Sequence, residues 1–406
     1  MRLSQSQSKV LSIVLAIVIC LSGCLGSLYY KTSGFTQLLI SMLLIMNIGI
    51  QILIVGRIKV HKVLFPICLL MNLFIFIGDP TFNTYGIQTS FSMMGMIVIV
   101  ALAKDIHINW IDYAIKYMKI CYLFYAIYTI LERFNSIFFK ISIMMFPNSF
   151  ETLYAQYSSG CMPGLTNHYS TNGMLLGIGM LLFGSEMIIK RRIKDVFLFL
   201  VFLIAMLLTG KRSGIIFTMA ALYMGFYCYM SNKKNKRLKQ TFIIVVVAVI
   251  GFILLVTFMP SLATFVHRFE EASQNGDVTL GRTKMWAIAI NAFKKSPLFG
   301  IGWGQFMYIN LHEWNAHNIY VQLLVETGIV GFSVFIIFFI YNLMNSWKML
   351  VKLRKSNTNS KTELFILISL AIQIYFLIYG FTGNPLYDKE VYIAYYMSCA
   401  ISNAYS

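Results

Sequence analysis

Two arginines in this sequence stand where a helix is expected to begin, and both suit the binding of an anion. Arg212 lies in the segment TGKRSG (209–214), directly before an apolar stretch, and Arg282 lies at the start of GRTKMW (281–286). The unpaired N–H groups and the dipole of a helix start favour a negative charge, and the planar guanidinium matches a pair of phosphate oxygens. The pattern predicts a site for a phosphate-bearing substrate. The alternative is an arginine that reaches lipid headgroups at the membrane interface.

His317 precedes another apolar stretch, which begins near residue 319. Histidine can take up a proton near neutral pH, so this side chain could act as a general base toward a hydroxyl group; a structural histidine at the interface is the alternative. Asn318, Gln322 and Glu326 recur every four residues and form a polar stripe on one helix face. An acid inside a membrane helix usually has a function or a partner. The stripe therefore indicates either substrate binding or hydrogen bonding between helices.

Two further segments combine polar or glycine-rich composition with aromatic residues. GLTNHYSTNG (164–173), which contains Asn167 and His168, is dense in hydroxyl, amide and imidazole groups. This composition suits the binding of a sugar, but it fits a polar helix cap equally well. GIGWGQF (300–306) offers glycines that permit close backbone approach, and Trp303, an aromatic residue suited to a membrane interface. It lacks the strand–turn–helix setting of a nucleotide-binding loop.

The elements that position these residues are expected to be membrane-spanning helices. Of the 406 residues, 58% are apolar and only 12% are charged, about half the charged share of a soluble globular protein. Long apolar runs recur along the chain, and each must be helical because lipid offers no hydrogen-bond partners. We predict an all-α, polytopic membrane protein that forms a single membrane domain over 1–406. About twelve spans are expected, near 10–28, 36–55, 63–77, 87–103, 111–130, 169–189, 195–209, 213–230, 241–259, 319–343, 364–380 and 390–405.

The distribution of charge predicts the orientation of these spans. Lys and Arg number 33 against 15 Asp and Glu, a formal net charge of +18. Basic residues concentrate in the cytoplasmic connections of membrane proteins, so both termini are expected on the cytoplasmic side and the outer side is nearly neutral. The net charge is therefore an orientation signal, and no nucleic acid is expected as a partner. Most of the basic residues lie in alternate connections, at 1–9, 56–62, 104–119, 190–195, 231–240 and 348–363.

Two connections on the outer side are too long to be simple turns, and loops of such length are usually functional. The range 131–168 is expected to be an outer loop with small interfacial segments. The range 260–318, between the ninth and tenth spans, is expected to be a large catalytic loop. Within it, we expect a short helix that begins at Arg282 and ends near Lys295. Gly281 and Thr283 mark its start, and Ser296-Pro297 follows its end.

The sequence lacks the motifs of metal-dependent or nucleotide-dependent chemistry. No residues have the spacing of a zinc site, and neither an Asp-x-Asp pair that resembles a metal site nor a Walker loop occurs. The seven cysteines lie mostly in apolar runs, which indicates small core residues rather than a disulfide framework. We expect chemistry without a metal ion or a cofactor.

Taken together, these segments resemble the polysaccharide polymerase and O-antigen ligase superfamily of bacterial inner membranes. The resemblance rests on TGKRSG (209–214), on GRTKMW followed by KSPLFGIGWGQF (281–306), and on AHNIYVQLLVETGIVG (316–331). GLTNHYSTNG (164–173) and GNPLYD (383–388) are more similar to the branch that polymerises repeats of capsule, exopolysaccharide or O-antigen. The similarity extends over roughly 160–390, and the residues before it match only as a set of hydrophobic spans.

The resemblance implies an all-helical glycosyltransferase of the GT-C type with its active site at the outer face of the bacterial cytoplasmic membrane. A glycan on undecaprenyl diphosphate would be the donor, and a hydroxyl of a second lipid-linked repeat would be the acceptor. Arg212 and Arg282 match the family's diphosphate-binding arginines, and His317 matches the histidine assigned to the acceptor hydroxyl. Further candidate substrate-binding residues are Lys211, Lys284, His168, Asn167, Asn318, Trp303 and Glu326.

A repeat-unit polymerase is the leading interpretation, and two alternatives remain open at this point. A ligase would use the same donor and transfer the glycan to lipid A core or to a protein. A transporter or flippase would also contain many spans, but it would predict inverted repeats and broken helices at the membrane midplane. Besides the lipid-linked substrate and the bilayer, a chain-length regulator and a flippase of the same pathway are candidate partners.

Overall fold

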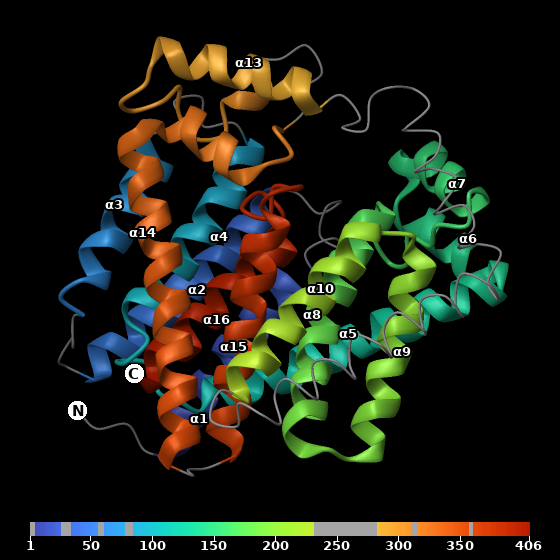
Figure 1. Ribbon diagram of the computed structural model, residues 1–406, viewed down its shortest axis with the longest axis horizontal. Coiled ribbons are helices and arrows are strands. Elements are labelled where there is room, and N and C mark those ends of the chain that lie inside the picture. The colour runs from blue at the N-terminus through green and yellow to red at the C-terminus, as the bar shows by residue number, and fades with distance from the viewer. Residues whose placement is uncertain are drawn as a thin grey trace.

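The structure is a computed structural model, and it describes residues 5–25, 34–55, 61–77, 84–230, 282–309, 315–356 and 360–406. Within these ranges every regular element is a helix, which confirms the all-α prediction (Figure 1). The span expected near 241–259, the basic run 233–237 and the first part of the second outer loop, 260–281, lie outside the described residues.

The helices match the expected apolar runs closely, because each run is bounded by polar or glycine residues that end a helix locally. The largest differences are at α14, which continues well beyond residue 343, and at α1, which begins and ends earlier than the expected range 10–28. The elements are α1 (Gln5–Gly23), α2 (Gly34–Val55), α3 (Leu64–Ile77), α4 (Thr84–Ala101), α5 (Trp110–Phe134), α6 (Ser136–Met145), η2 (Pro147–Ser149), α7 (Phe150–Ser158), α8 (Tyr169–Lys190), α9 (Ile193–Thr209), α10 (Arg212–Tyr229), α13 (Arg282–Lys295), η3 (Phe306–Tyr308), α14 (Ile319–Ser356), α15 (Ser360–Tyr379) and α16 (Lys389–Tyr405).

Among the described helices, α5, α8, α14 and α15 are long and apolar enough to cross a membrane. Shorter apolar helices lie in α1 to α4 and in α6. The chain is therefore a multi-pass membrane protein by the length and composition of its helices, while the count of twelve spans and the GT-C fold stay predictions.

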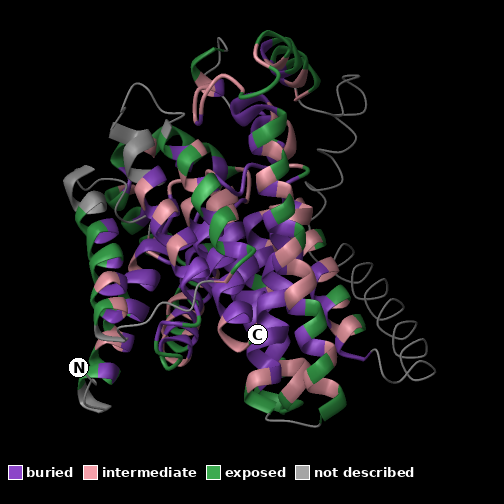
Figure 2. Cartoon of the chain, turned by 90° about the vertical axis from the view of Figure 1, so that its left-hand side faces the viewer, coloured by how far each residue is buried: buried purple, intermediate pink, exposed green. Residues whose placement is uncertain are grey.

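The core of the bundle lies around α16, where buried residues gather in the middle of the molecule (Figure 2). This helix packs against α1, α4, α14 and α15, and its side chains are buried from Glu390 to Asn403. Its modest apolar content follows from this position, since neighbouring helices rather than lipid surround it and can pair its polar groups. The Asn403 amide, for example, donates to the Asn342 side-chain oxygen at 2.7 Å.

The two ends of the bundle carry different segments. Helix α13 lies across one end, above the start of α14, whereas the turn between α8 and α9 and the C-terminal end of α14 lie at the opposite end (Figure 1). Helices α8, α10 and α14 begin with the polar motifs that the sequence singled out, and these starts lie at the α13 end. This arrangement brings distant parts of the chain together at one end of the bundle.

Candidate active site

Helix α13 is held above the start of α14 by one apolar face. Met285, Ala289 and Ala292 are buried in a small cluster with Phe306, Ala316 and Val325. The Trp286 indole N–H also donates to the carbonyl oxygen of Ala316 at 2.9 Å. The helix predicted from Arg282 to Lys295 is confirmed, and Arg282 lies in its first turn, next to the segment that contains His317.

The loop after α13 inserts into a kink in α14. The Ile301 N–H donates to the Val325 carbonyl, and the Gly302 N–H donates to the Glu326 carbonyl, both at 3.0 Å. The kink is at Gly328, which has φ 63°. A Cβ atom on Gly300 would lie 2.4 Å from the carbonyl group of Glu326. Glycine is therefore required at these two positions for the backbones to approach so closely.

Two buried side chains fix the position of this loop: Glu326 of α14 and Trp303 of the loop itself. The Glu326 carboxylate, 1% exposed, accepts hydrogen bonds from the backbone N–H groups of Gly304 and Phe306 and from the Tyr387 hydroxyl. The Trp303 ring, 3% exposed, stacks on Tyr387 with 5.2 Å between ring centroids. Both side chains position the loop, and substrate contact by either stays a prediction.

The polar stripe on α14 makes hydrogen bonds along its whole length. The Asn318 side-chain oxygen accepts from the backbone N–H groups of Tyr320 and Val321, so Asn318 caps the helix. The Gln322 side chain accepts from the Ala316 N–H at 3.0 Å and donates to Glu326. The three stripe residues therefore form hydrogen bonds with their own helix and its preceding turn, and substrate binding by them stays a prediction.

His317 precedes this cap and has a left-handed backbone, with φ 51°. Its side chain is exposed. The start of α14 is tied to the end of α15, because the Ile319 N–H donates to the Gly380 carbonyl at 2.9 Å and the Asn318 amide donates to the Phe381 carbonyl. His317 therefore lies at the surface in a turn whose position is fixed by these two hydrogen bonds.

Lys211 joins three separate parts of the chain. It follows Gly210, whose positive φ of 68° ends α9, and it directly precedes α10. Its ammonium donates to the Ser170 hydroxyl in the first turn of α8, and it lies 5.5 Å from the centroid of the Tyr379 ring at the end of α15. Arg212, the first residue of α10, is half-buried beside it, as expected for an arginine at a helix start.

The 164–173 segment fulfils the role of a helix cap. The His168 imidazole accepts a hydrogen bond from the Ser170 N–H at 3.0 Å, and the Asn172 amide donates to the Thr129 hydroxyl at 2.9 Å. Burial and the nearby Lys211 charge lower the pKa of His168 to about 4, so its ring is neutral and can accept this bond at neutral pH. Sugar binding by Asn167 and His168 stays a prediction.

The charges at this end of the bundle influence one another. Although His317 is exposed, neighbouring groups shield part of its ring from water, and this partial desolvation lowers its pKa; the positive charges of Arg282 and Lys211 lower the pKa further. The pKa of Lys211 falls to about 8, mainly through burial, with Asp388 opposing and Arg282 adding to the shift. Burial and Glu390 raise the pKa of Asp388 to about 7, against the effect of Lys211. Lys211, Arg282, His317 and Asp388 therefore form one electrostatically coupled group, here named the polar cluster.

Other candidate residues lie outside the polar cluster. Lys284 is exposed on the first turn of α13, and Asn167 is half-buried before α8. Conversely, the structure adds Ser170, Tyr379 and Asp388, which were not among the candidate site residues. A signal for Asp388 was available, since it is an acid directly before an apolar helix and within the GNPLYD segment.

The polar cluster has the groups needed to bind an anion and to move a proton. Lys211 and Arg282 are cationic at pH 7, and the lowered pKa of His317 keeps its imidazole neutral and able to accept a proton. Asp388 provides an acid that changes its charge close to neutral pH. A phosphate-bearing substrate with a reactive hydroxyl partner fits this set of groups.

Comparison with known proteins gives one family match. Residues 197–336 match the family model described as O-antigen ligase, and the curated proteins include no match to the chain. The matched range extends from α9 into α14 and contains Lys211, Arg212, Arg282, His317 and Glu326. The match over this segment supports the membership of the chain in the O-antigen ligase and polysaccharide polymerase superfamily.

Proposed function

We propose that this protein is a repeat-unit polymerase of capsule, exopolysaccharide or O-antigen synthesis. It transfers a glycan from undecaprenyl diphosphate to a hydroxyl group of a second lipid-linked repeat at the outer face of the cytoplasmic membrane. The observation that carries the proposal is the packing that brings three separate segments together. The Trp286–Ala316 hydrogen bond holds the helix of Arg282 beside the turn of His317, and the Ile319 N–H bond to Gly380 holds this turn at the end of α15, where Lys211 lies over Tyr379. The charges of Arg282 and Lys211 accordingly act on His317.

In the proposed reaction, the acceptor hydroxyl oxygen attacks the anomeric carbon of the donor. The bond between this carbon and the phosphate oxygen breaks, and its electron pair leaves with undecaprenyl diphosphate. The hydroxyl proton passes to the neutral imidazole of His317. Arg212, Arg282 and Lys211 stabilise the negative charge of the leaving diphosphate, and positioned positive groups of this kind make a large contribution to catalysis.

Two features favour a polymerase over a ligase. The segments that resemble the polymerase branch are 164–173 and 383–388, and a residue of each interacts with Lys211. Ser170 of the first segment accepts a hydrogen bond from the Lys211 ammonium. The negative charge of Asp388 in the second segment raises the pKa of Lys211. A ligase remains the second candidate because the matched family is described as O-antigen ligase.

The test is an assay of the purified protein with the lipid-linked repeat as sole substrate. A ladder of longer lipid-linked products is expected. Product that forms only after lipid A core or an acceptor protein is added would identify a ligase instead. A transporter would form no product in this assay, with or without an added acceptor.

A further inference from the structure

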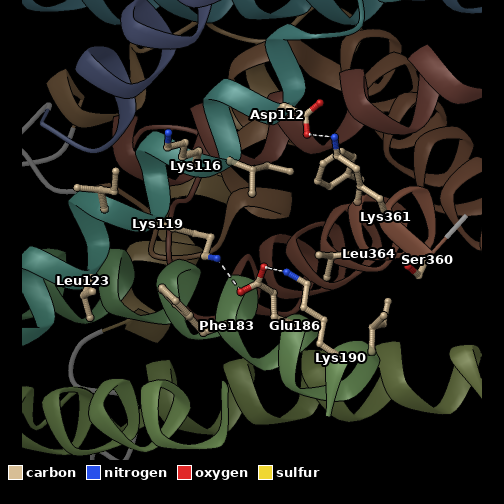
Figure 3. A pocket seen from close by; sticks show the side chains of 14 residues that line it. Asp112, Lys116, Lys119, Leu123, Phe183, Glu186, Lys190, Ser360, Lys361 and Leu364 are labelled. Carbon is tan, nitrogen blue, oxygen red and sulfur yellow. Dashed lines mark hydrogen bonds and ion pairs between the residues drawn. The ribbon is translucent and has the colours of Figure 1, made fainter. Parts of the chain in front are cut away.

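A cavity of about 560 Å³ lies at the end of the bundle opposite the polar cluster. It is lined by α5, α8 and α15, including Lys190 at the end of α8 and Ser360 at the start of α15 (Figure 3). The other ends of these two helices carry Ser170 and Tyr379, which contact Lys211. The length of a helix therefore separates the cavity from the proposed transfer site.

Lysines outnumber acids in the lining of this cavity. Glu186 is 4% exposed and pairs with both Lys119 and Lys190, each at 2.6 Å. Lys361 pairs with Asp112 at 2.6 Å. Lys116 also lines the cavity and is exposed.

The ion pairs found among the described residues do not include Lys116. Lys116 therefore adds positive charge to the lining of the cavity, beyond the lysines that pair with Glu186 and Asp112 (Figure 3). An anion at this position would gain a favourable interaction without breaking an existing pair.

Apart from Ser360, the rest of the lining is apolar, and this apolar surface continues onto the exposed face of α5. Ile120, Phe124 and Ile127 are 58%, 57% and 45% exposed, and with Lys116 they follow the spacing of one helix face. At 1.5 Å per residue, Lys116 and Ile127 lie roughly 16 Å apart along the axis. This distance is comparable to the hydrocarbon depth of one leaflet, about 15 Å.

We propose that this cavity binds an anionic phospholipid of the inner leaflet. The phosphate lies against Lys116 and Lys119, and one acyl chain follows Ile120, Phe124 and Ile127. The charge distribution of the sequence assigns this end of the bundle to the cytoplasmic side, where anionic lipids are available. The proposal does not depend on glycan transfer at the polar cluster.

The test compares lipid retention by the full-length protein in a neutral detergent. Native mass spectrometry measures binding of phosphatidylglycerol and of phosphatidylcholine with identical acyl chains to the wild-type, Lys116→Ala and Lys194→Ala proteins. Lys194 is a matched control, since it is an exposed lysine near the same end of the bundle and does not line the cavity. Glycerol 3-phosphate is added in a separate arm as a soluble phosphate without acyl chains.

The wild-type protein should retain phosphatidylglycerol in preference to phosphatidylcholine. Lys116→Ala should weaken this binding about five-fold, the effect of one lysine at an anionic lipid surface, and Lys194→Ala should not. Equal loss in the two variants, or equal retention of the two lipids, would show general charge attraction and overturn the proposal. Displacement by glycerol 3-phosphate would show a phosphate site that does not require a lipid, which also overturns it.

A second variant examines the acyl-chain contact. Phe124→Ser should reduce retention of both lipids and leave the headgroup preference of the remaining binding unchanged. Unchanged retention in this variant would contradict the assigned path of the acyl chain. Because no readout uses glycan transfer, failure of this proposal and failure of the proposed function are distinguishable.

Discussion

The carboxylate of Glu326, buried inside α14, accepts a hydrogen bond from the backbone N–H of Gly304 at 3.0 Å. The same carboxylate also accepts from the Phe306 N–H at 3.1 Å. These bonds fasten the loop that follows α13, and α13 carries Arg282. An acid in a membrane helix thus determines the position of a candidate substrate-binding arginine without contacting it.

Replacing Glu326 with alanine should destabilise the protein. Each buried N–H left without an acceptor costs about 1–3 kcal/mol, so the thermal unfolding temperature in detergent should fall clearly. Glu326→Gln keeps one acceptor oxygen and should have an intermediate effect. Glu151→Ala, at an exposed acid of α7, is the control, and equal unfolding temperatures of Glu326→Ala and this control would contradict the anchoring role.

Gly328 and Gly304 provide a matched pair of substitutions. Both have a positive φ, 63° and 74°, but a Cβ atom at Gly328 would lie 2.3 Å from the Leu298 carbonyl group, whereas Gly304 has open space. Gly304→Ala should cost about 1–2 kcal/mol for the left-handed backbone alone, and Gly328→Ala about 3–5 kcal/mol because steric overlap is added. The yield of monodisperse protein and its unfolding temperature measure the difference; similar values for both variants would argue against the tight loop contact.

Arg282→Ala should reduce polymer formation about 100- to 1,000-fold, the usual effect of removing one group that stabilises developing negative charge. Arg212→Ala should have an effect of the same order, because the proposed reaction uses both guanidinium groups. The assay is the product ladder from purified lipid-linked repeat. Lys294→Ala, an exposed lysine in the last turn of α13, should remain active, and wild-type ladders from the arginine variants would refute the diphosphate assignment.

His317→Gly tests the imidazole separately from the backbone. Glycine adopts the left-handed φ of this position without strain, so a loss of activity reports the missing base and not a distorted turn. We expect a decrease of about 100- to 10,000-fold with little change in unfolding temperature. His107→Ala removes an exposed histidine outside the polar cluster and should leave activity intact. Activity of His317→Gly near the wild-type level would exclude His317 as the base.

The rate of polymer formation should depend on pH in a bell-shaped manner. The pKa of His317 is below its ordinary value of 6.5, so its imidazole is protonated, and the rate falls, only at pH values below that. The pKa of Lys211 is about 8, so its positive charge is lost, and the rate falls again, above about pH 8. The measurement is the rate of ladder formation across this range.

Two variants should move the alkaline decline in opposite directions. Lys211→Arg keeps a positive charge to high pH, so the decline should move upward. Asp388→Asn removes the negative charge that raises the pKa of Lys211, so the decline should move downward. A decline that stays at the same pH in both variants would mean that Lys211 does not produce it.

The sequence by itself determined the helical membrane architecture and the local position of the proposed chemistry. Apolar run length specifies where helices form, and helix starts are encoded by nearby polar residues, so Arg212 and Arg282 were correctly expected at the beginnings of α10 and α13. The four-residue spacing of Asn318, Gln322 and Glu326 likewise predicted one helix face. These properties depend on neighbours within a few residues, which a single sequence displays.

Only the tertiary structure decided how these polar groups are used. Glu326 accepts a hydrogen bond from a loop more than twenty residues earlier in the chain. Lys211 contacts Ser170 and Tyr379, which belong to two other helices. The central position of α16, the least apolar of the predicted spans, was also decided by packing. Such contacts join residues that are far apart in the chain, and their formation depends on how whole helices fit together, which local composition and spacing do not encode.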